Sequence, residues 1–82
     1  MKKVIRYTGS WCQPCKIYAP KFEKVASETP GVEFETIDVD SGDPRLLEHG
    51  IRNVPTTVVI ENNQVRKQTG NMSVDQLKAF IG

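Results

Sequence analysis

Cys12 and Cys15 are the residues of this chain whose type and spacing could carry redox chemistry. They are its only cysteines, and two residues separate them. Thiols at that spacing can close a small disulfide ring, so they can pass electrons as well as lock structure. A zinc site is poorly supported, because four ligands are usual and only His49 and carboxylates remain. An iron–sulfur cluster shared between two chains is the other, less favoured, metal alternative.

The length and composition of the chain indicate how many domains it forms and which classes of partner they do not favour. Eighty-two residues support one domain, 1–82, and contents of 38% hydrophobic and 26% charged residues are ordinary for a globular protein. A net charge of +1 predicts neither a nucleic-acid partner nor an acidic substrate. We expect a monomer that binds no metal.

At the start of the chain we expect no targeting or membrane segment. Met1–Tyr7 holds only a two-residue apolar run before Arg6, far short of a signal-peptide core or a membrane span. The sequence therefore predicts a cytoplasmic location without membrane contact. Permanent disulfides are rare in that compartment, so a catalytic or metal-binding role is favoured over a structural cross-link for a cysteine pair there.

Hydrophobic spacing predicts the elements that position the two cysteines. A strand is predicted at 4–7, followed by a helix from about Cys12 to Glu28. Apolar residues recur in this helix at steps of three and four, at Cys15, Tyr18, Ala19, Phe22, Val25 and Ala26. Ser10 is the expected N-cap, and Pro14 suits the first turn, where its missing N–H costs nothing. Pro20 predicts a kink in one helix rather than two helices.

The rest of the chain predicts three more strands and two more helices. They are a strand at 32–39, a short helix at 43–50, a buried strand at 56–60, an edge strand at 65–69 and a final helix at 74–81. A tight turn at 61–64 joins the last two strands, since asparagine tolerates positive φ. Ser73 and Gln76 form a capping box, and Met72 can pack onto Leu77. The order β-α-β-α-β-β-α predicts an α/β fold with one mixed four-stranded sheet, order 2-1-3-4, and helices on both faces.

These elements give the two cysteines different roles. Cys12 falls where the first strand ends and the long helix begins, and the free N–H groups and positive dipole end of a helix stabilise a thiolate. We therefore expect Cys12 to be the nucleophile. Cys15 lies one turn further along the apolar stripe, so it is expected to be shielded and to react second. Trp11 gives a flat apolar contact surface beside the pair, and Lys16 adds positive charge.

The segment Trp11–Lys16 resembles the active site of thioredoxins, whose pattern is Trp-Cys-Gly-Pro-Cys-Lys. Pro20 falls where that family places its helix-kinking proline. The segment 50–56 resembles the family's cis-proline loop, and 70–81 resembles its last loop and helix. The resemblance covers nearly the whole chain from Val4 onward. Ordinary thioredoxins have an extra strand and helix before the first strand predicted here, so the chain resembles the short, glutaredoxin-sized thioredoxins with a minimal thioredoxin fold.

This resemblance implies a cis Val54–Pro55 bond and a protein disulfide reductase that works by dithiol–disulfide exchange. Cys12 and Cys15 would be the catalytic residues and the redox-active disulfide. A substrate would lie against Trp11, Gln13, Pro14, Val54, Pro55, Gly70 and Asn71. Because Gln13-Pro14 contains no histidine or other cation, we expect a reductant rather than an oxidant.

The resemblance also implies partners. No cofactor would be bound, and electrons would come from NADPH through a flavin-dependent thioredoxin reductase. Acceptors would be disulfide-containing cytosolic proteins such as ribonucleotide reductase or peroxiredoxin. Two alternatives stay open: a glutathione-dependent, glutaredoxin-like reductase, and a non-catalytic thioredoxin-fold binding subunit.

Three departures from the family pattern concern single residues. Arg6 stands where thioredoxins place a buried acid that moves the proton of the second cysteine, and Thr36 stands near its partner lysine. We expect Arg6 to reach out through a thinly covered face, with its charge solvated and without a catalytic role. The alternative is that Arg6 points toward the site and lowers the thiol pKa values. Gln13 replaces a glycine and is expected to change partner choice only modestly. His49, in the short helix, is expected to be a surface residue.

Overall fold

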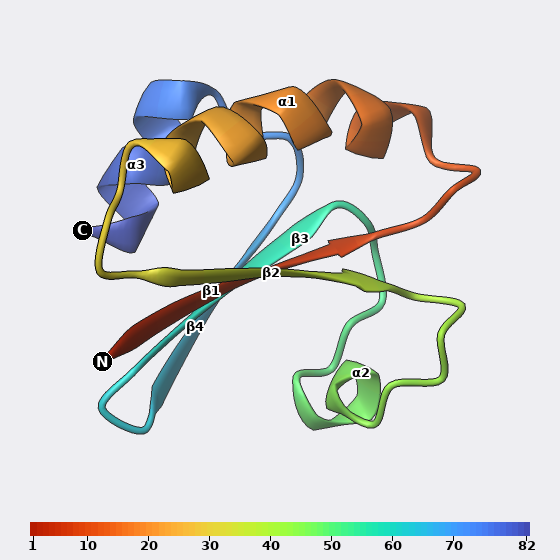
Figure 1. Cartoon of the computed structure of the whole chain (residues 1–82). Helices are drawn as coiled ribbons and strands as arrows, with labels where there is room; N and C mark the ends of the chain where they lie inside the picture. Colours follow the sequence, from red (N-terminus) through yellow and green to blue (C-terminus); the bar gives the residue numbers. More distant parts are fainter.

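The computed structural model describes all 82 residues, and Figure 1 shows a twisted sheet between two helical layers. The elements in chain order are β1 (Lys2–Thr8), α1 (Gln13–Ser27), β2 (Glu33–Asp38), α2 (Arg45–Glu48), β3 (Thr56–Glu61), β4 (Gln64–Thr69) and α3 (Val74–Ile81). Each predicted element is present. The strand β1 begins two residues earlier than predicted, because Lys2 and Lys3 pair with Glu61 and Ile60 of β3.

The sheet has the predicted order, β2-β1-β3-β4. Strands β1 and β2 are parallel, whereas β3 is antiparallel to both β1 and β4. Helices α1 and α3 cover one face of the sheet and the short α2 covers the other (Figure 1). Because β1 is central, the chain leaves it in the middle of the sheet and enters α1 directly above it.

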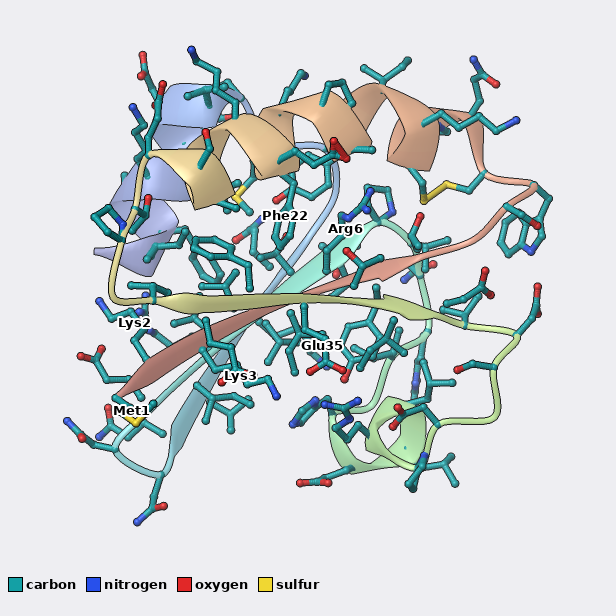
Figure 2. All side chains as sticks on the ribbon, viewed as in Figure 1. Met1, Lys2, Lys3, Arg6, Phe22 and Glu35 are labelled. Carbon is teal, nitrogen blue, oxygen red and sulfur yellow. A yellow bond between two sulfur atoms is a disulfide. The ribbon has the colours of Figure 1, made fainter.

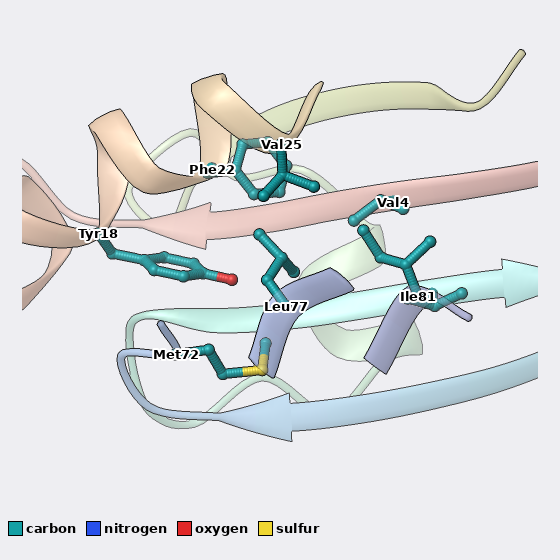
Figure 3. Packing of buried hydrophobic residues seen from close by; sticks show 8 residues of the cluster. Val4, Tyr18, Phe22, Val25, Met72, Leu77 and Ile81 are labelled. Atoms are coloured by element: carbon teal, nitrogen blue, oxygen red, sulfur yellow. The ribbon is translucent and has the colours of Figure 1, made fainter. Parts of the chain in front are cut away.

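Two cores lie on the two faces of the sheet, and β1 contributes to both. Val4 points toward α1 and α3, and its neighbour Ile5 belongs to the core on the α2 face, as the pleat of a strand requires. Figure 3 shows the larger core, which consists of Val4, Tyr18, Phe22, Val25, Val59, Met72, Leu77 and Ile81. The smaller core consists of Ile5, Tyr7, Ile37 and Val58. The packing of α1 on the first core fixes the end of the helix that carries the cysteines.

Helix α1 begins differently from the prediction. Its N-cap is Cys12 rather than Ser10, because Cys12 Sγ accepts a hydrogen bond from the Cys15 backbone N–H at 3.2 Å. The helix then runs without a break through Pro20 to Ser27, as one helix rather than two. A reactive sulfur thus occupies the position at which a capping oxygen usually satisfies a free helix N–H.

Local signals at the C-terminal half are confirmed. Asn62 and Asn63 have φ values of 50° and 68°, which is the geometry of a tight hairpin turn between β3 and β4. Ser73 Oγ accepts from the Gln76 N–H and Gln76 Oε1 accepts from the Ser73 N–H, which completes the capping box of α3. Met72 and Leu77 are both buried in the larger core.

The α2 face is held by charges and by one buried histidine. Arg45 makes a two-bond ion pair with Glu35 of β2, at 2.9 and 2.7 Å, and a second ion pair with Asp43. The prediction that His49 is a surface residue is wrong, because its side chain is only 6% exposed and its Nδ1 lies 2.7 Å from Tyr7 Oη. A partner on β1, 42 residues away, draws the ring inward.

Candidate functional site

A disulfide joins Cys12 and Cys15 at the N-terminal end of α1, and Figure 2 shows it as a yellow bond above the end of β1. The two Cα atoms are 5.3 Å apart. Strand β1 ends at Thr8, and residues 9–11 carry the chain to Cys12. Cys12 is 5% exposed and Cys15 is 1% exposed.

The surroundings of Cys12 favour negative charge on its sulfur. It lies at the first turn of a 15-residue helix, and the Cys15 N–H donates to it. Partial positive charge and a free donor at that point lower the pKa of a thiol. The Val54 carbonyl oxygen lies 3.7 Å from Cys12 Sγ, so the loop before β3 faces the same sulfur.

That loop carries the cis bond between Val54 and Pro55, as predicted. Pro55 is buried, and its carbonyl accepts a hydrogen bond of 2.8 Å from the Gly70 N–H. The hydrogen bond ties the cis-proline loop to the turn that follows β4. The disulfide, the cis-proline loop and Gly70 therefore lie at one end of the sheet, although they are far apart in sequence.

Comparison with known proteins matches this arrangement to one family. The family model described as Thioredoxin matches residues 1–82. The chain belongs to the thioredoxin family. It is 32% identical to a thioredoxin of Mycoplasmoides gallisepticum over 98% of this chain and 81% of that protein. It is 36% identical to the mitochondrial thioredoxin of Bos taurus over 95% of this chain but only 48% of that protein.

Solved thioredoxin structures share the fold closely. The thioredoxin of Malassezia sympodialis, Mala s 13, superposes with a TM-score of 0.84 at 38% identity, over 98% of this chain and 71% of that one. Thioredoxins are thiol–disulfide oxidoreductases, and this chain has the cysteine pair for the same reaction. They bind no cofactor of their own and are reduced by a thioredoxin reductase. None of the three helices in this chain is long and apolar enough to span a membrane.

Trp11 stands at the mouth of this thioredoxin-family site, 67% exposed. Its indole N–H donates to Asp40 Oδ2 at 3.2 Å, which holds the ring against the end of β2. Gly9 lies beneath the ring, and an added Cβ there would lie 2.9 Å from Trp11 Cε2. Gly9 and Asp40 were not predicted from the sequence, because neither has a local signal that points to Trp11.

The residues predicted to contact substrate are not all brought together. Trp11 and Val54 line one hollow of about 250 Å³, together with Val39, Ile51, Arg52 and Asn53. Gly70 and Asn71 instead line a separate hollow of about 520 Å³ between the end of β4 and α3. Gln13 and Pro14 are exposed and line neither hollow. Residues 39 and 51–53 are additions that sequence reasoning missed, although 51–53 lie within the family-like loop.

The expectation that the charge of Arg6 is solvated is wrong. Arg6 is only 9% exposed and lies on the face that α1 covers. Its Nε and one Nη donate to Thr36 Oγ1 at 3.3 and 3.1 Å, and its guanidinium lies 5.3 Å from the centre of the Phe22 ring. Burial lowers the pKa of this guanidinium. The hydroxyl and the ring partly replace the water that the charge loses, which is why the side chain folds inward.

Proposed function

We propose that the chain is a protein disulfide reductase in which Cys12 attacks and Cys15 resolves. The observation that carries this proposal is the disulfide at the start of α1, with Cys12 as the N-cap and the Val54 carbonyl facing its sulfur. The more deeply buried Cys15 lies behind it on the helix. Only Cys12 is therefore reachable from the loop side, where a partner would approach.

The proposed reaction is a two-step exchange in which every disulfide bond formed is matched by one that breaks. The Cys12 thiolate attacks one sulfur of the substrate disulfide, which forms a mixed disulfide and releases the other sulfur as a thiolate. Cys15, after losing its proton to solvent, attacks Cys12 Sγ. The Cys12–Cys15 bond forms, the bond to the substrate breaks, and the second substrate thiolate takes up a proton. The substrate gains two electrons and the pair loses two.

The substrate segment is proposed to lie across Trp11 and the Val54–Pro55 loop, with Gln13 and Pro14 beside it. The small hollow between Trp11 and Val54 has a mainly apolar lining, which suits a side chain next to the substrate cysteine. Gly70 and Asn71 would contact the segment beyond the cis-proline loop, to which Gly70 is hydrogen-bonded. The contact is mainly with backbone and apolar surface, so it fits many unrelated proteins.

The proposed electron path starts at NADPH and reaches Cys12 through a flavin-dependent thioredoxin reductase. Ribonucleotide reductase and peroxiredoxin represent the class of cytosolic acceptor. We place the reaction in the cytoplasm because a reducing compartment keeps such a pair in its dithiol form. The chain is proposed to act as a single domain and a monomer.

Reduction of insulin by dithiothreitol tests the proposal. The wild-type chain is expected to accelerate it, and Cys12→Ser is expected to abolish the acceleration. Cys15→Ser is expected to accumulate a covalent complex with the substrate, which a non-reducing gel shows. Ser10→Ala is the matched control, because Ser10 is exposed, caps nothing and lies two residues before Cys12. No acceleration by the wild type, or full acceleration by Cys12→Ser, contradicts the proposal.

A further inference from the structure

Arg6 is a buried cation without a carboxylate partner. Its hydrogen bonds go to the neutral hydroxyl of Thr36, and its other close neighbour is the Phe22 ring. The ion pairs of the molecule involve other cations, such as Lys3 and Arg45, and none involves Arg6. The charge is therefore held in the interior without being neutralised by an adjacent anion, and its field extends into its surroundings.

Those surroundings include the helix that carries the cysteines. Figure 2 shows the Arg6 side chain in the layer between β1 and α1, on the same side of the sheet as the disulfide. Phe22 lies on the buried stripe of α1 that begins at Cys15 and includes Tyr18. Phe22 is seven positions after Cys15, which is roughly 10 Å of helix rise. The cation and the Cys15 sulfur thus face the same interior layer.

Tyr18 connects the surroundings of Arg6 with the buried stripe of α1 that contains Cys15. Its hydroxyl lies 2.6 Å from Thr57 Oγ1, and Thr57 pairs with Arg6 across β1 and β3. Tyr18 is one helical turn from Cys15. The positive charge of Arg6 acts to lower the pKa of Tyr18, although burial raises that pKa overall. The field of Arg6 therefore reaches the hydroxyl of a residue that shares the buried stripe of α1 with Cys15.

We propose that Arg6 is a positioning residue that favours the thiolate of Cys15 in the resolving step. This inference rests on the proposed role of Cys15. The positive charge of Arg6 in the layer beneath α1 favours the loss of the Cys15 proton. No carboxylate receives this proton, and it passes to solvent. The Cys15 thiolate then attacks Cys12 Sγ, the Cys12–Cys15 bond forms, and the substrate leaves as a thiolate. The charge changes the population of the attacking form and makes no bond.

Other charges face this region and set the background for the effect. On α1, Glu23 lies near enough to raise the pKa of Arg6, against the effect of burial, and Lys16 follows Cys15 directly. From the sheet, the neighbours of Arg6 are Thr36 and Thr57, which carry no charge. The N-terminal dipole of α1 acts on both cysteines. A substitution of Arg6 leaves all of these groups in place.

The pKa of Cys15 tests the proposal directly. In a Cys12→Ser background Cys15 is the sole thiol, and its thiolate absorbance in the ultraviolet is followed against pH. Arg6→Gln and Arg6→Met are each expected to raise the pKa of Cys15 by about one unit, the size expected for a charge at on the order of 10 Å in a protein interior. Arg6→Lys, which keeps a charge, is expected to retain most of the original value. Circular dichroism checks that each variant folds. If Arg6→Gln does not fold, Arg6→Met is the second neutral variant, because its apolar side chain can keep the contact with Phe22.

Two results would overturn the proposal. One is an unchanged pKa of Cys15 in either neutral variant that folds. The other is an equal upward shift in Arg6→Lys, because that would assign the effect to shape rather than to charge. The titration measures no turnover, so it tests the role of Arg6 even if the chain does not reduce insulin. An unchanged pKa of Cys15 would contradict the role of Arg6 but not the reductase proposal.

Discussion

Tyr7 Oη and His49 Nδ1 lie 2.7 Å apart, although the two residues are 42 positions apart in the sequence. The two rings meet edge to face, with centres 6.1 Å apart. Tyr7 is the last fully buried residue of β1 before the redox pair, and His49 directly precedes the loop that leads to Pro55. The Lys67 ammonium donates to the His49 carbonyl as well. The start of the cis-proline loop is thus anchored to the strand that presents Cys12.

Tyr7→Phe is expected to destabilise the fold by about 1–2 kcal/mol, because it leaves a buried ring nitrogen of His49 without its partner. Urea unfolding followed by circular dichroism measures the free energy of unfolding. Glu48→Gln is the control, since Glu48 is exposed and its carboxylate is no closer than 4.0 Å to the ring. Equal stability of Tyr7→Phe and the wild type would contradict an anchoring role for this pair.

Stability is expected to fall in acid because of the ion pairs around Arg45. Hydrogen bonds from Arg45 and Lys3 lower the pKa of Glu35 from its ordinary 4.5 to about 2. Hydrogen bonds from Arg45 also lower the pKa of Asp43 from 3.8 to about 2. A carboxylate with a depressed folded-state pKa contributes stability above its unfolded pKa and loses it as the pH falls through the folded value.

The loss is therefore expected between about pH 4.5 and 2, and thermal melts across that range measure it. Glu35→Gln removes one titrating group, so its melting temperature is expected to depend less on pH in this window. The exposed Glu23→Gln variant serves as the control, with an unchanged slope. An equal slope in Glu35→Gln would show that this carboxylate does not contribute.

Trp11→Ala is expected to lower kcat/KM for insulin about tenfold, because a largely exposed aromatic side chain at the mouth of the site supplies contact area for a partner. Reduction of a small-molecule disulfide is expected to change little, since it needs no such surface. Gly9→Ala is expected to act in the same direction but more weakly, because its Cβ would push the indole ring aside. Equal losses with both substrates would assign Trp11 to the chemistry instead of to docking.

Asn63→Gly is expected to stabilise the chain by about 0.5–1 kcal/mol, because Asn63 has a φ of 68° and glycine adopts that region without a steric cost. Chemical denaturation measures the change. Asn63→Ala provides the opposite test, since its side chain cannot make the local hydrogen bonds that help asparagine there. A lower stability for Asn63→Gly than for Asn63→Ala would be inconsistent with the turn geometry.

The sequence by itself determined the elements and the chemistry at the start of α1. The stripe from Cys15 to Val25, the capping box at Ser73 and the Asn62-Asn63 turn are local patterns whose spacing follows from helix and strand geometry. Such signals depend on neighbours a few residues away. The cis Val54–Pro55 bond also agreed with expectation, through the resemblance of its loop to a known family.

Only the tertiary structure decided where individual polar side chains settle. Arg6 was expected in solvent and is buried against Phe22, because parallel pairing of β1 with β2 brings Thr36 beside it as an acceptor. His49 was expected at the surface and is buried against Tyr7. A polar group enters the interior when the fold supplies partners that replace water, and those partners come from distant strands. Residue type and spacing located the redox pair, whereas long-range packing decided which charge lies beneath it.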